Sequence, residues 1–512
     1  MGIPYAASTA GNNRFRTTQA RQPWNATRNS TLYGPGCPQA DHNPDVPKIQ
    51  SEDCLNLNVW LPTKTATATA TATANKNTTT PTTPDLLPIG IFFHGGAFKE
   101  GSNQGPFDLY DGAYFSARSG VIVITANYRL GALGFLTSND AGSVGNYGIQ
   151  DQRFALQWVQ DNAARLGGDK TKVTMWGESA GGMSELIHML SPASTGLFSR
   201  IIMESNPAGY IYRNVKEASD FGKGFVKDVG CLGQGSPEQA MVCLRAANIS
   251  TITKATGKSN IGDIVKAVLS GAHLLDVFLP YTPTSGTANI PDYRVSKHMH
   301  FINPVPLLIG TNRNEGDTFI LAGLTSPLSK LEYNVMIDAI FGITGDNTKV
   351  KSRYPPQKDS RGQLGQLVTD YWFRCASQRV AGNIQHRLNS STSTFMYWYN
   401  HSVSFGPQMW PKYNFPFCVN RVCHGAELPF VFHNSANWTL TQEELVLSDY
   451  MVDAWGHFIK HEDKYLRDTQ GWPNYNDTSK LVMALKPTPT VVSTIEEENG
   501  LCAFWDEIGY NH

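Results

Sequence analysis

The sequence predicts an α/β fold with a central, mostly parallel sheet, helices on both faces and helical insertions over one edge. Runs such as Leu87–Phe93 and Val121–Thr125 are apolar at almost every position, which is typical of strands buried on both faces. After the second run, residues 151–166 place apolar side chains on one helical face and end at a glycine pair. A glycine-flanked serine then follows a third strand and begins another helix. Strands that alternate with helices in this way are typical of an α/β fold with a parallel sheet.

The N-terminal part of the chain contains few regular elements. Residues 1–50 are polar and loop-like, and Cys54–Leu61 is the first segment that alternates apolar and polar side chains as a strand does. Thr63–Pro84 is a Thr/Ala tract that ends in Thr and Pro. Such a composition buries too little apolar surface to order itself, so we expect a flexible excursion between two strands that is open to O-glycosylation.

The rest of the chain continues the alternation of strands and helices. We predict strands at Lys172–Trp176, Arg200–Met203, Pro306–Ile309 and Thr394–Trp398, and a helix at Met183–Leu190. Two long segments between late strands are mostly helical in pattern and form the expected insertions, residues 215–290 and 320–390. The chain has neither an internal repeat nor a clear linker, so residues 1–512 are expected to form a single domain.

Composition excludes several classes of protein. The 42 basic and 43 acidic side chains leave a formal net charge of −1, and no basic run indicates a nucleic-acid partner. No apolar stretch reaches the roughly 18 residues of a membrane span. Hydrophobic residues make up 41% of the chain, which is enough for a large core. We therefore expect a globular protein with a large core, and neither nucleic-acid binding nor a membrane span is indicated.

Cysteines and glycosylation motifs indicate a secretory compartment. The chain has eight cysteines, an even number, and the Asn-x-Ser/Thr motif occurs at Asn25, Asn29, Asn77, Asn248, Asn389, Asn400, Asn437 and Asn476. Paired cysteines and such motifs are typical of secreted proteins. The first residues, Met1-Gly-Ile-Pro-Tyr-Ala6, do not form a signal peptide. We expect an extracellular protein in a mature or truncated form.

The most informative motif is Gly177-Glu178-Ser179-Ala180-Gly181. It joins a strand to a helix, and this arrangement holds a nucleophilic serine in a strained turn above the sheet. Glycine is required at both ends because side chains there would collide as strand and helix approach each other. The alternative is an ordinary glycine-rich turn. The context of strand before and helix after favours the nucleophile.

A serine hydroxyl needs a base, an acid that orients the base, and donors for an oxyanion. The loop after Leu87–Phe93, His94-Gly-Gly-Ala97, provides small residues whose amides, with that of Ala180, form a predicted oxyanion hole, while His94 itself is expected to be structural. Glu315 and Asp317 follow a later strand and are chemically equivalent candidates for the acid. His424 follows both, in the chain order of serine, acid and histidine.

These residues lie in a longer series of motifs. The series includes Glu52-Asp-Cys-Leu55, His94-Gly-Gly-Ala-Phe98, Gly145-Asn-Tyr-Gly-Ile-Gln-Asp-Gln152, Asn314-Glu-Gly316 and His424-Gly-Ala-Glu-Leu-Pro429. The chain thereby resembles type-B carboxylesterases and lipases of the α/β-hydrolase fold, including fungal secreted enzymes, over nearly its whole length. The resemblance implies a serine hydrolase that cleaves carboxylic esters through an acyl-enzyme. It assigns Ser179 as nucleophile, Glu315 as acid, His424 as base, and Gly96, Ala97 and Ala180 as the oxyanion donors.

The family pattern also implies a pairing of the cysteines, which spacing alone leaves open. It implies Cys37–Cys54, Cys231–Cys243 and Cys375–Cys502, and leaves Cys418 and Cys423 to close a short ring before His424 or to remain as free thiols. Members of the family usually have an N-terminal β-hairpin before the motif at Gly2, where this chain begins. The segment between Cys37 and Cys54 contains no tryptophan, so a cholinesterase is not indicated.

The same segment bears on the substrate. In related lipases it is a long apolar lid, whereas here the 16 residues Pro38–Asp53 are short, polar and rich in proline. We expect an open site for dissolved esters of short to medium acyl length. An interfacial lipase, with a lid supplied by residues 215–290 or 320–390, is the alternative. A non-catalytic adhesion protein is disfavoured because the triad residues are present. The sequence has no His-Glu-x-x-His or Cys-x-x-Cys, so no metal or other cofactor is expected.

Overall fold

The computed structural model describes most of the chain. The described residues are 1–40, 47–62, 86–257, 268, 274–295, 299–388, 393–494 and 500–510. The Thr/Ala tract at residues 63–84 lies outside them, and so do residues 41–46 of the segment between Cys37 and Cys54.

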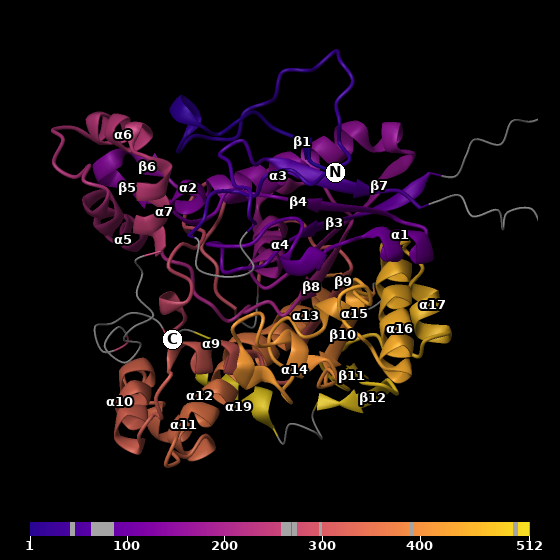
Figure 1. Ribbon diagram of the computed structural model, residues 1–512. Coiled ribbons are helices and arrows are strands. Elements are labelled where there is room, and N and C mark those ends of the chain that lie inside the picture. Colours follow the sequence, from indigo (N-terminus) through magenta and orange to yellow (C-terminus); the bar gives the residue numbers. More distant parts are fainter. Residues whose placement is uncertain are drawn as a thin grey trace, which may run out of the picture.

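Ten strands of the described residues form one twisted sheet through the centre of the molecule (Figure 1). Their order across the sheet is β1-β2-β4-β3-β7-β8-β9-β10-β11-β12, and all neighbours from β4 to β11 are parallel. A separate hairpin consists of β5 (Thr137–Ser138) and β6 (Ser143–Val144). The ten strands are β1 (Ile3–Pro4), β2 (Asn56–Trp60), β3 (Leu87–Phe93), β4 (Ile122–Ala126), β7 (Gly168–Glu178), β8 (Arg200–Glu204), β9 (Leu307–Asn312), β10 (Thr394–Tyr399), β11 (Leu481–Leu485) and β12 (Thr490–Ser493).

Helices cover both faces of the sheet, as the apolar strands predict. A π-helical turn, Thr369–Arg374, joins two of them. The α-helices are α1 (Ala113–Ser119), α2 (Gly131–Phe135), α3 (Tyr147–Asn162), α4 (Ala180–Leu190), α5 (Val215–Asp228), α6 (Pro237–Ala246), α7 (Ile249–Gly257), α9 (Glu315–Gly323), α10 (Lys330–Phe341), α11 (Asn347–Arg353), α12 (Arg361–Val368), α13 (Cys375–Arg387), α14 (Gly406–Met409), α15 (Leu428–Val431), α16 (Gln442–Ile459), α17 (Asp463–Asp468) and α19 (Leu501–Ile508).

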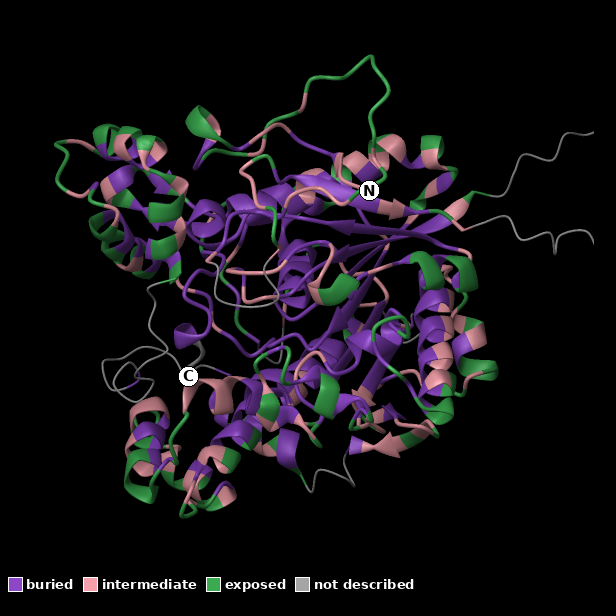
Figure 2. Ribbon diagram, viewed as in Figure 1, coloured by how far each residue is buried: buried purple, intermediate pink, exposed green. Residues whose placement is uncertain are grey.

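The sheet separates two hydrophobic cores. Successive side chains of a strand point to opposite faces, so Ile91 and Phe93 of β3 enter one core and Phe92 enters the other. The first core contains the apolar faces of α3, α4 and α13, and the second contains those of α1 and α16. Figure 2 shows the strands as the most continuously buried part of the molecule. This burial on both faces is why the central strands are apolar without alternation.

The strands that the sequence predicts at the centre of the sheet are confirmed, with shifts of a few residues at their ends. The strands that it misses lie at the margins. β1 has only two residues, and β11 and β12 form the opposite margin, where β12 pairs antiparallel and is only partly buried. The edge strands β1 and β12 have a weak hydrophobic pattern because one of their sides is open to solvent. This reason does not apply to β11, which is apolar and buried between β10 and β12.

Helix α3 begins four residues before the predicted start at Asp151 and ends at Asn162, where a 3₁₀ turn continues to Leu166. Asp151 is buried inside the helix and accepts hydrogen bonds from the guanidinium group of Arg129 at 2.7 and 2.9 Å. An acidic residue is typical of a helix start, and here an ion pair places it in the helix interior instead. The glycine at the end of the turn is confirmed, since Gly167 adopts a left-handed φ of 74°.

The helical insertions consist of two groups on the same side of the molecule, α5–α7 above and α10–α12 below in Figure 1. Helices α5 and α6 begin with reciprocal capping boxes, at Asn214 with Glu217 and at Ser236 with Gln239. Helix α13 does not lie over an edge of the sheet as residues 320–390 are expected to do. Its buried residues Val380, Ala381 and Ile384 pack into the first core and cover a face.

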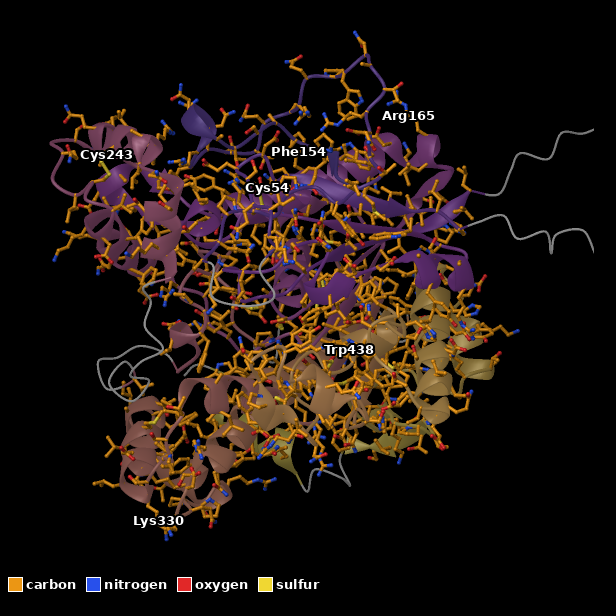
Figure 3. All side chains as sticks on the ribbon, viewed as in Figure 1. Cys54, Phe154, Arg165, Cys243, Lys330 and Trp438 are labelled. Carbon is orange, nitrogen blue, oxygen red and sulfur yellow. A yellow bond between two sulfur atoms is a disulfide. The ribbon has the colours of Figure 1, made fainter. Side chains whose placement is uncertain are left out.

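Four disulfides connect distant parts of this framework. They are Cys37–Cys54, Cys231–Cys243 and Cys375–Cys502, which the family resemblance implies, and Cys418–Cys423, for which free thiols were the alternative. Figure 3 labels Cys54 beside the central sheet and Cys243 in the group α5–α7. Cys375–Cys502 spans 127 positions and connects α13 to the C-terminal α19, whereas Cys418–Cys423 spans five and precedes His424 directly.

We predict that the long and the short disulfide have different roles. Replacing Cys375 and Cys502 by Ser should lower the free energy of unfolding by about 5 kcal/mol. The reason is that a disulfide lowers the entropy of the unfolded chain, and it lowers it more when it closes a longer loop. Replacing Cys418 and Cys423 by Ser should lower it by only about 2 kcal/mol but should reduce kcat for ester hydrolysis more clearly. Thermal unfolding and kinetics of the two double variants test this. Equal effects of both on Tm and kcat would contradict it.

Candidate active site

Ser179 occupies a sharp turn between β7 and α4. Its backbone has φ 56° and ψ −117°, a strained conformation for a residue with a side chain. The two flanking glycines make the turn possible. A Cβ atom on Gly181 would lie 2.0 Å from the carbonyl oxygen of Phe93, and one on Gly177 would lie 2.8 Å from the carbonyl carbon of Gly181. The Ser179 amide donates to the Glu204 carbonyl at 2.9 Å, which ties the turn to β8.

The loop after β3 lies beside this serine. Gly96 has φ 99°, and a Cβ there would lie 2.1 Å from the carbonyl oxygen of Glu100. Ala97 also has a positive φ, of 54°, which is uncommon for alanine. In the described part of the chain, the amides of Gly96, Ala97 and Ala180 donate to no recorded acceptor. Donors that remain free next to a serine are available to a ligand oxygen.

His94 anchors the base of this loop. It is buried, its ring stacks on Tyr128 at 4.6 Å between centroids, and its Nδ1 lies 2.8 Å from the carbonyl oxygen of Gly95. Burial lowers the pKa of His94 to about 4, so the imidazole is neutral. The prediction that His94 is structural fits these contacts.

His424 and Glu315 form a close pair at the carboxyl end of the sheet. Nδ1 of His424 lies 2.5 Å from Oε2 of Glu315, and the other oxygen, Oε1, accepts the backbone amide of Asn312 at 2.6 Å. Glu315 is fully buried. A buried carboxylate in this position fixes the tautomer and the orientation of the imidazole.

Asp317, the alternative acid, has a different partner. It is buried and forms an ion pair with Arg421. Burial raises the pKa of Asp317, and the arginine opposes that change. Helix α9 begins at Glu315, so two residues further along the helix the side chain points about 200° away, toward Arg421. The geometry therefore separates two carboxylates that sequence chemistry treats as equivalent.

The histidine loop is held at several points. Asn314 and Cys423 form a β-bridge, and the Asn314 amide donates to the Val422 carbonyl at 2.9 Å. The amide of His424 donates to Oγ1 of Thr318 at 3.1 Å. The rings of Phe319 and Phe373 pack against the imidazole at 5.1 and 5.4 Å between centroids. These contacts leave the imidazole little freedom to turn.

Glu178, the residue before the serine, is a site residue that the sequence reasoning missed. Its Oε1 lies 3.1 Å from Nε2 of His424, so the imidazole lies between two carboxylates. Burial lowers the pKa of His424, but the charges of Glu178 and Glu315 outweigh it and raise the pKa to about 9. Burial raises the pKa of Glu178 to about 8. A proton is thus retained in this row of groups near neutral pH and must leave before the imidazole can act as a base.

Two more buried carboxylates extend the row. Glu427 accepts hydrogen bonds from Asn312 and, at 3.1 Å, from the hydroxyl of Ser205, and burial raises its pKa to about 7. Glu204 accepts from the indoles of Trp176 and Trp455. Burial, strengthened by Glu427, raises the pKa of Glu204 well above its usual value. Glu427 lies inside the motif that begins at His424, which is the sequence signal that could have identified it.

A pocket of about 200 Å³ opens above the serine and is mostly apolar. Ser179, His424 and the loop of Gly96 and Ala97 form its floor. Its walls are aromatic or aliphatic, and come from segments far apart in the sequence: Pro106, Leu109, Tyr110, Leu279, Phe319, Phe373, Met409, Trp410, Tyr413, Phe415, Leu428 and Pro429. Such a cavity accommodates a small organic ligand with its polar group at the serine.

One wall of this pocket is a strained turn, residues 105–110. Phe107 and Asp108 both have positive φ angles, of 52° and 55°. The side-chain amide of Asn437 donates to the carbonyl of Phe107 at 2.6 Å and to Oδ1 of Asn434 at 2.8 Å. Asn434 in turn donates to the carbonyl of Asp108 at 3.2 Å. Trp438, labelled in Figure 3, packs edge-on against the ring of Phe107 at 6.0 Å.

No group of three or more His, Cys, Asp or Glu side chains in the described residues is arranged to hold a metal ion. Among those residues, no helix has both the length and the hydrophobicity to span a membrane.

A covered parallel sheet, a strained serine turn and a carboxylate–histidine pair at its carboxyl end together define a serine hydrolase of the α/β-hydrolase fold. The chain belongs to the carboxylesterase family, whose model matches residues 1–505, and it is a carboxylic ester hydrolase.

Individual relatives agree with this. The chain is 31% identical to the crystal protein of Dictyostelium discoideum, over 100% of this chain and 88% of that protein. It is 29% identical to carboxylesterase 1E of Mus musculus, over 99% and 89% of the two chains. A solved structure described as a thermophylic PNB esterase superposes with a TM-score of 0.76 at 28% identity, covering 98% of this chain and 95% of that one.

We predict that Asn437 holds the pocket wall through its amide. Asn437→Ala should lower kcat/KM for p-nitrophenyl hexanoate about threefold to tenfold, which corresponds to the loss of one or two hydrogen bonds. It should lower kcat/KM for p-nitrophenyl acetate less. Thr439→Ala is the matched control, because it removes the glycosylation motif but keeps the amide of Asn437. An equal loss for both esters, or the same loss in Thr439→Ala, would contradict this role.

Proposed function

We propose that Ser179, His424 and Glu315 are the catalytic triad of this esterase. The observation that carries the proposal is the 2.5 Å contact between Glu315 and His424 in the pocket that also contains Ser179. Gly96, Ala97 and Ala180 are the proposed oxyanion donors, which is supported by amides without another recorded acceptor in the described residues.

The reaction follows from these roles. Nε2 of neutral His424 takes the proton of Ser179 as Oγ attacks the ester carbonyl, and the oxyanion accepts hydrogen bonds from the three amides. His424 then gives the proton to the leaving alkoxide, and the acyl group stays on Oγ. A water molecule repeats the sequence, so the acid is released and Ser179 recovers its proton. Glu315 stabilises the imidazolium in both halves and keeps its own negative charge.

The proposed substrates are dissolved esters of short to medium acyl length. A lid from the segment between Cys37 and Cys54 is disfavoured by its internal ties. Gly36 pairs with Gln50, the amide of Gly36 donates to Ile49 at 3.0 Å, and Gln39 exchanges two hydrogen bonds with Gly101. A segment tied to the oxyanion loop in this way does not swing as a unit. The small volume of the pocket also favours short acyl groups.

The other proposals concern where and how the chain is made. We propose a secreted glycoprotein folded as one domain, supported by the four disulfides. Six of the eight glycosylation motifs lie in described residues, each with an exposed or partly exposed asparagine. The side-chain nitrogen of Asn437 already donates two hydrogen bonds, and an attached sugar would leave it only one N–H. The sites proposed are the other five: Asn25, Asn29, Asn248, Asn400 and Asn476. A non-catalytic adhesion protein is disfavoured, because such a protein has no use for a serine, an acid and a histidine that are brought together at a pocket.

The nucleophile is tested directly. Ser179→Ala and His424→Ala should each lower kcat by roughly a million-fold, since the groups act as a unit. A fluorophosphonate probe should label the wild-type chain at Ser179 and leave Ser179→Ala unlabelled. Hydrolysis by Ser179→Ala within tenfold of wild type would show that another nucleophile is used.

The choice of acid has its own test. Glu315→Gln should reduce kcat severely, because an amide stabilises the imidazolium poorly and disturbs the tautomer. Asp317→Asn should keep kcat near wild type, because it affects only the ion pair with Arg421 at the start of α9. Circular dichroism of both variants controls for folding. The opposite order of kcat values would make Asp317 the acid.

The open site is tested with a short triglyceride. The rate should follow saturation kinetics up to the solubility limit and should not rise beyond it, because the described part of the segment between Cys37 and Cys54 is tied to the loop after β3. A sharp rise once droplets form would identify an interfacial lipase. The variant Cys37→Ser with Cys54→Ser is the matched control, since it frees the only disulfide of the segment concerned.

A further inference from the structure

A single carboxylate interrupts the apolar walls of the pocket. Glu100 lies in the loop after β3, is half-buried and lines the cavity together with Ser179. Its Cγ lies 3.3 Å from the position that a Cβ on Gly96 would occupy, so its side chain is next to a proposed oxyanion donor. Among the residues that the structure describes, none forms an ion pair or a side-chain hydrogen bond with Glu100.

The other charges around the pocket do not neutralise Glu100. The described residues that line the cavity include no lysine or arginine. His424 is the basic group among them, and it already contacts Glu315 and Glu178, the second acid of the lining. Lys412 is outside the lining, with its ammonium 4.8 Å from the centroid of the Trp438 ring. Within the described part of the chain, the Glu100 carboxylate therefore has no protein partner, which leaves it available to solvent or to a ligand.

An unpaired carboxylate at this place has a disadvantage for catalysis. It repels the negative charge that develops on the ester oxygen, and it disfavours the passage of plain hydrocarbon chains. Both effects are reversed for a substrate that carries a positive charge on its non-reacting part. Aromatic side chains around the same cavity, such as Trp410 and Tyr413, also attract cations through their ring faces.

We propose that Glu100 is a specificity-determining residue that binds a protonated amine on the acyl or the alcohol part of the ester. The proposal rests on the proposed function, since it concerns the same pocket, and it narrows the substrate class to short esters that carry an ammonium group. The ammonium donates hydrogen bonds to the Glu100 carboxylate while the ester carbonyl lies at Ser179.

Matched esters test this. The p-nitrophenyl ester of ω-aminohexanoic acid and that of heptanoic acid have the same length and differ only in their last group, ammonium or methyl. The acetates of ω-aminohexanol and heptanol form the corresponding pair on the alcohol side. For each pair we define the ratio of kcat/KM for the amine ester to kcat/KM for its methyl counterpart. In at least one pair this ratio should exceed one for the wild-type enzyme, and Glu100→Gln should reduce it roughly tenfold. Raising the salt concentration should reduce it in wild type as well.

Glu238→Gln is the control, because Glu238 is an exposed carboxylate at the start of α6, away from the pocket lining. It should leave both ratios as in wild type. Ratios that are the same in wild type and Glu100→Gln for both pairs would overturn the proposal, even if Ser179→Ala abolishes all hydrolysis. Conversely, hydrolysis that survives Ser179→Ala would overturn the triad, while the ratios would still report on Glu100.

Discussion

The close approach of helix α4 to the strands β3 and β7 is the constraint on which the site depends. The helix lies so near the sheet that a methyl group on Gly181 would overlap the carbonyl oxygen of Phe93. This approach forces the turn before the helix into a left-handed conformation at Ser179. The strain is sustained because burial of the strands on both faces, together with the hydrogen bond that the Ser179 amide donates to β8, leaves the turn no relaxed alternative.

A second constraint is electrostatic. Four glutamates, at positions 178, 204, 315 and 427, are buried around one histidine. Each is stabilised by specific donors or by the imidazole, since a buried carboxylate without a partner would be strongly destabilising. Burial raises the pKa of Glu178, Glu204 and Glu427, so protons are retained in this cluster near neutral pH. A histidine surrounded in this way is protonated more readily than one in water, which suits the step in which it carries the proton of the serine.

The pocket walls follow a different principle from its floor. The floor consists of short turns directly after strands, and the sheet sets their positions. The walls come from the segments around Tyr110, Phe319, Phe373 and Trp410, which are brought together only by packing. Loops at the carboxyl ends of parallel strands can vary without disturbing the sheet, which is why substrate preference resides in them. A residue such as Glu100 belongs to both parts, since its backbone supports the oxyanion loop while its side chain faces the pocket.

The sequence by itself determined the central strands, the serine turn, the glycine-rich loop and the histidine. These depend on local patterns: apolar runs without alternation, glycine where a Cβ would collide, and order along the chain. Local chemistry left Glu315 and Asp317 equal, and only the family resemblance selected Glu315. The physical reason lies in the start of α9, which turns Glu315 toward His424 and Asp317 toward Arg421. The sequence did not identify Glu178 as a partner of the imidazole, and it did not show that α13 covers a face of the sheet. It also did not reveal the hydrogen bond from Asn437 to the turn at Phe107. Each of these is a contact between segments far apart in the chain, and a local pattern carries no information about which distant group the fold will place beside it.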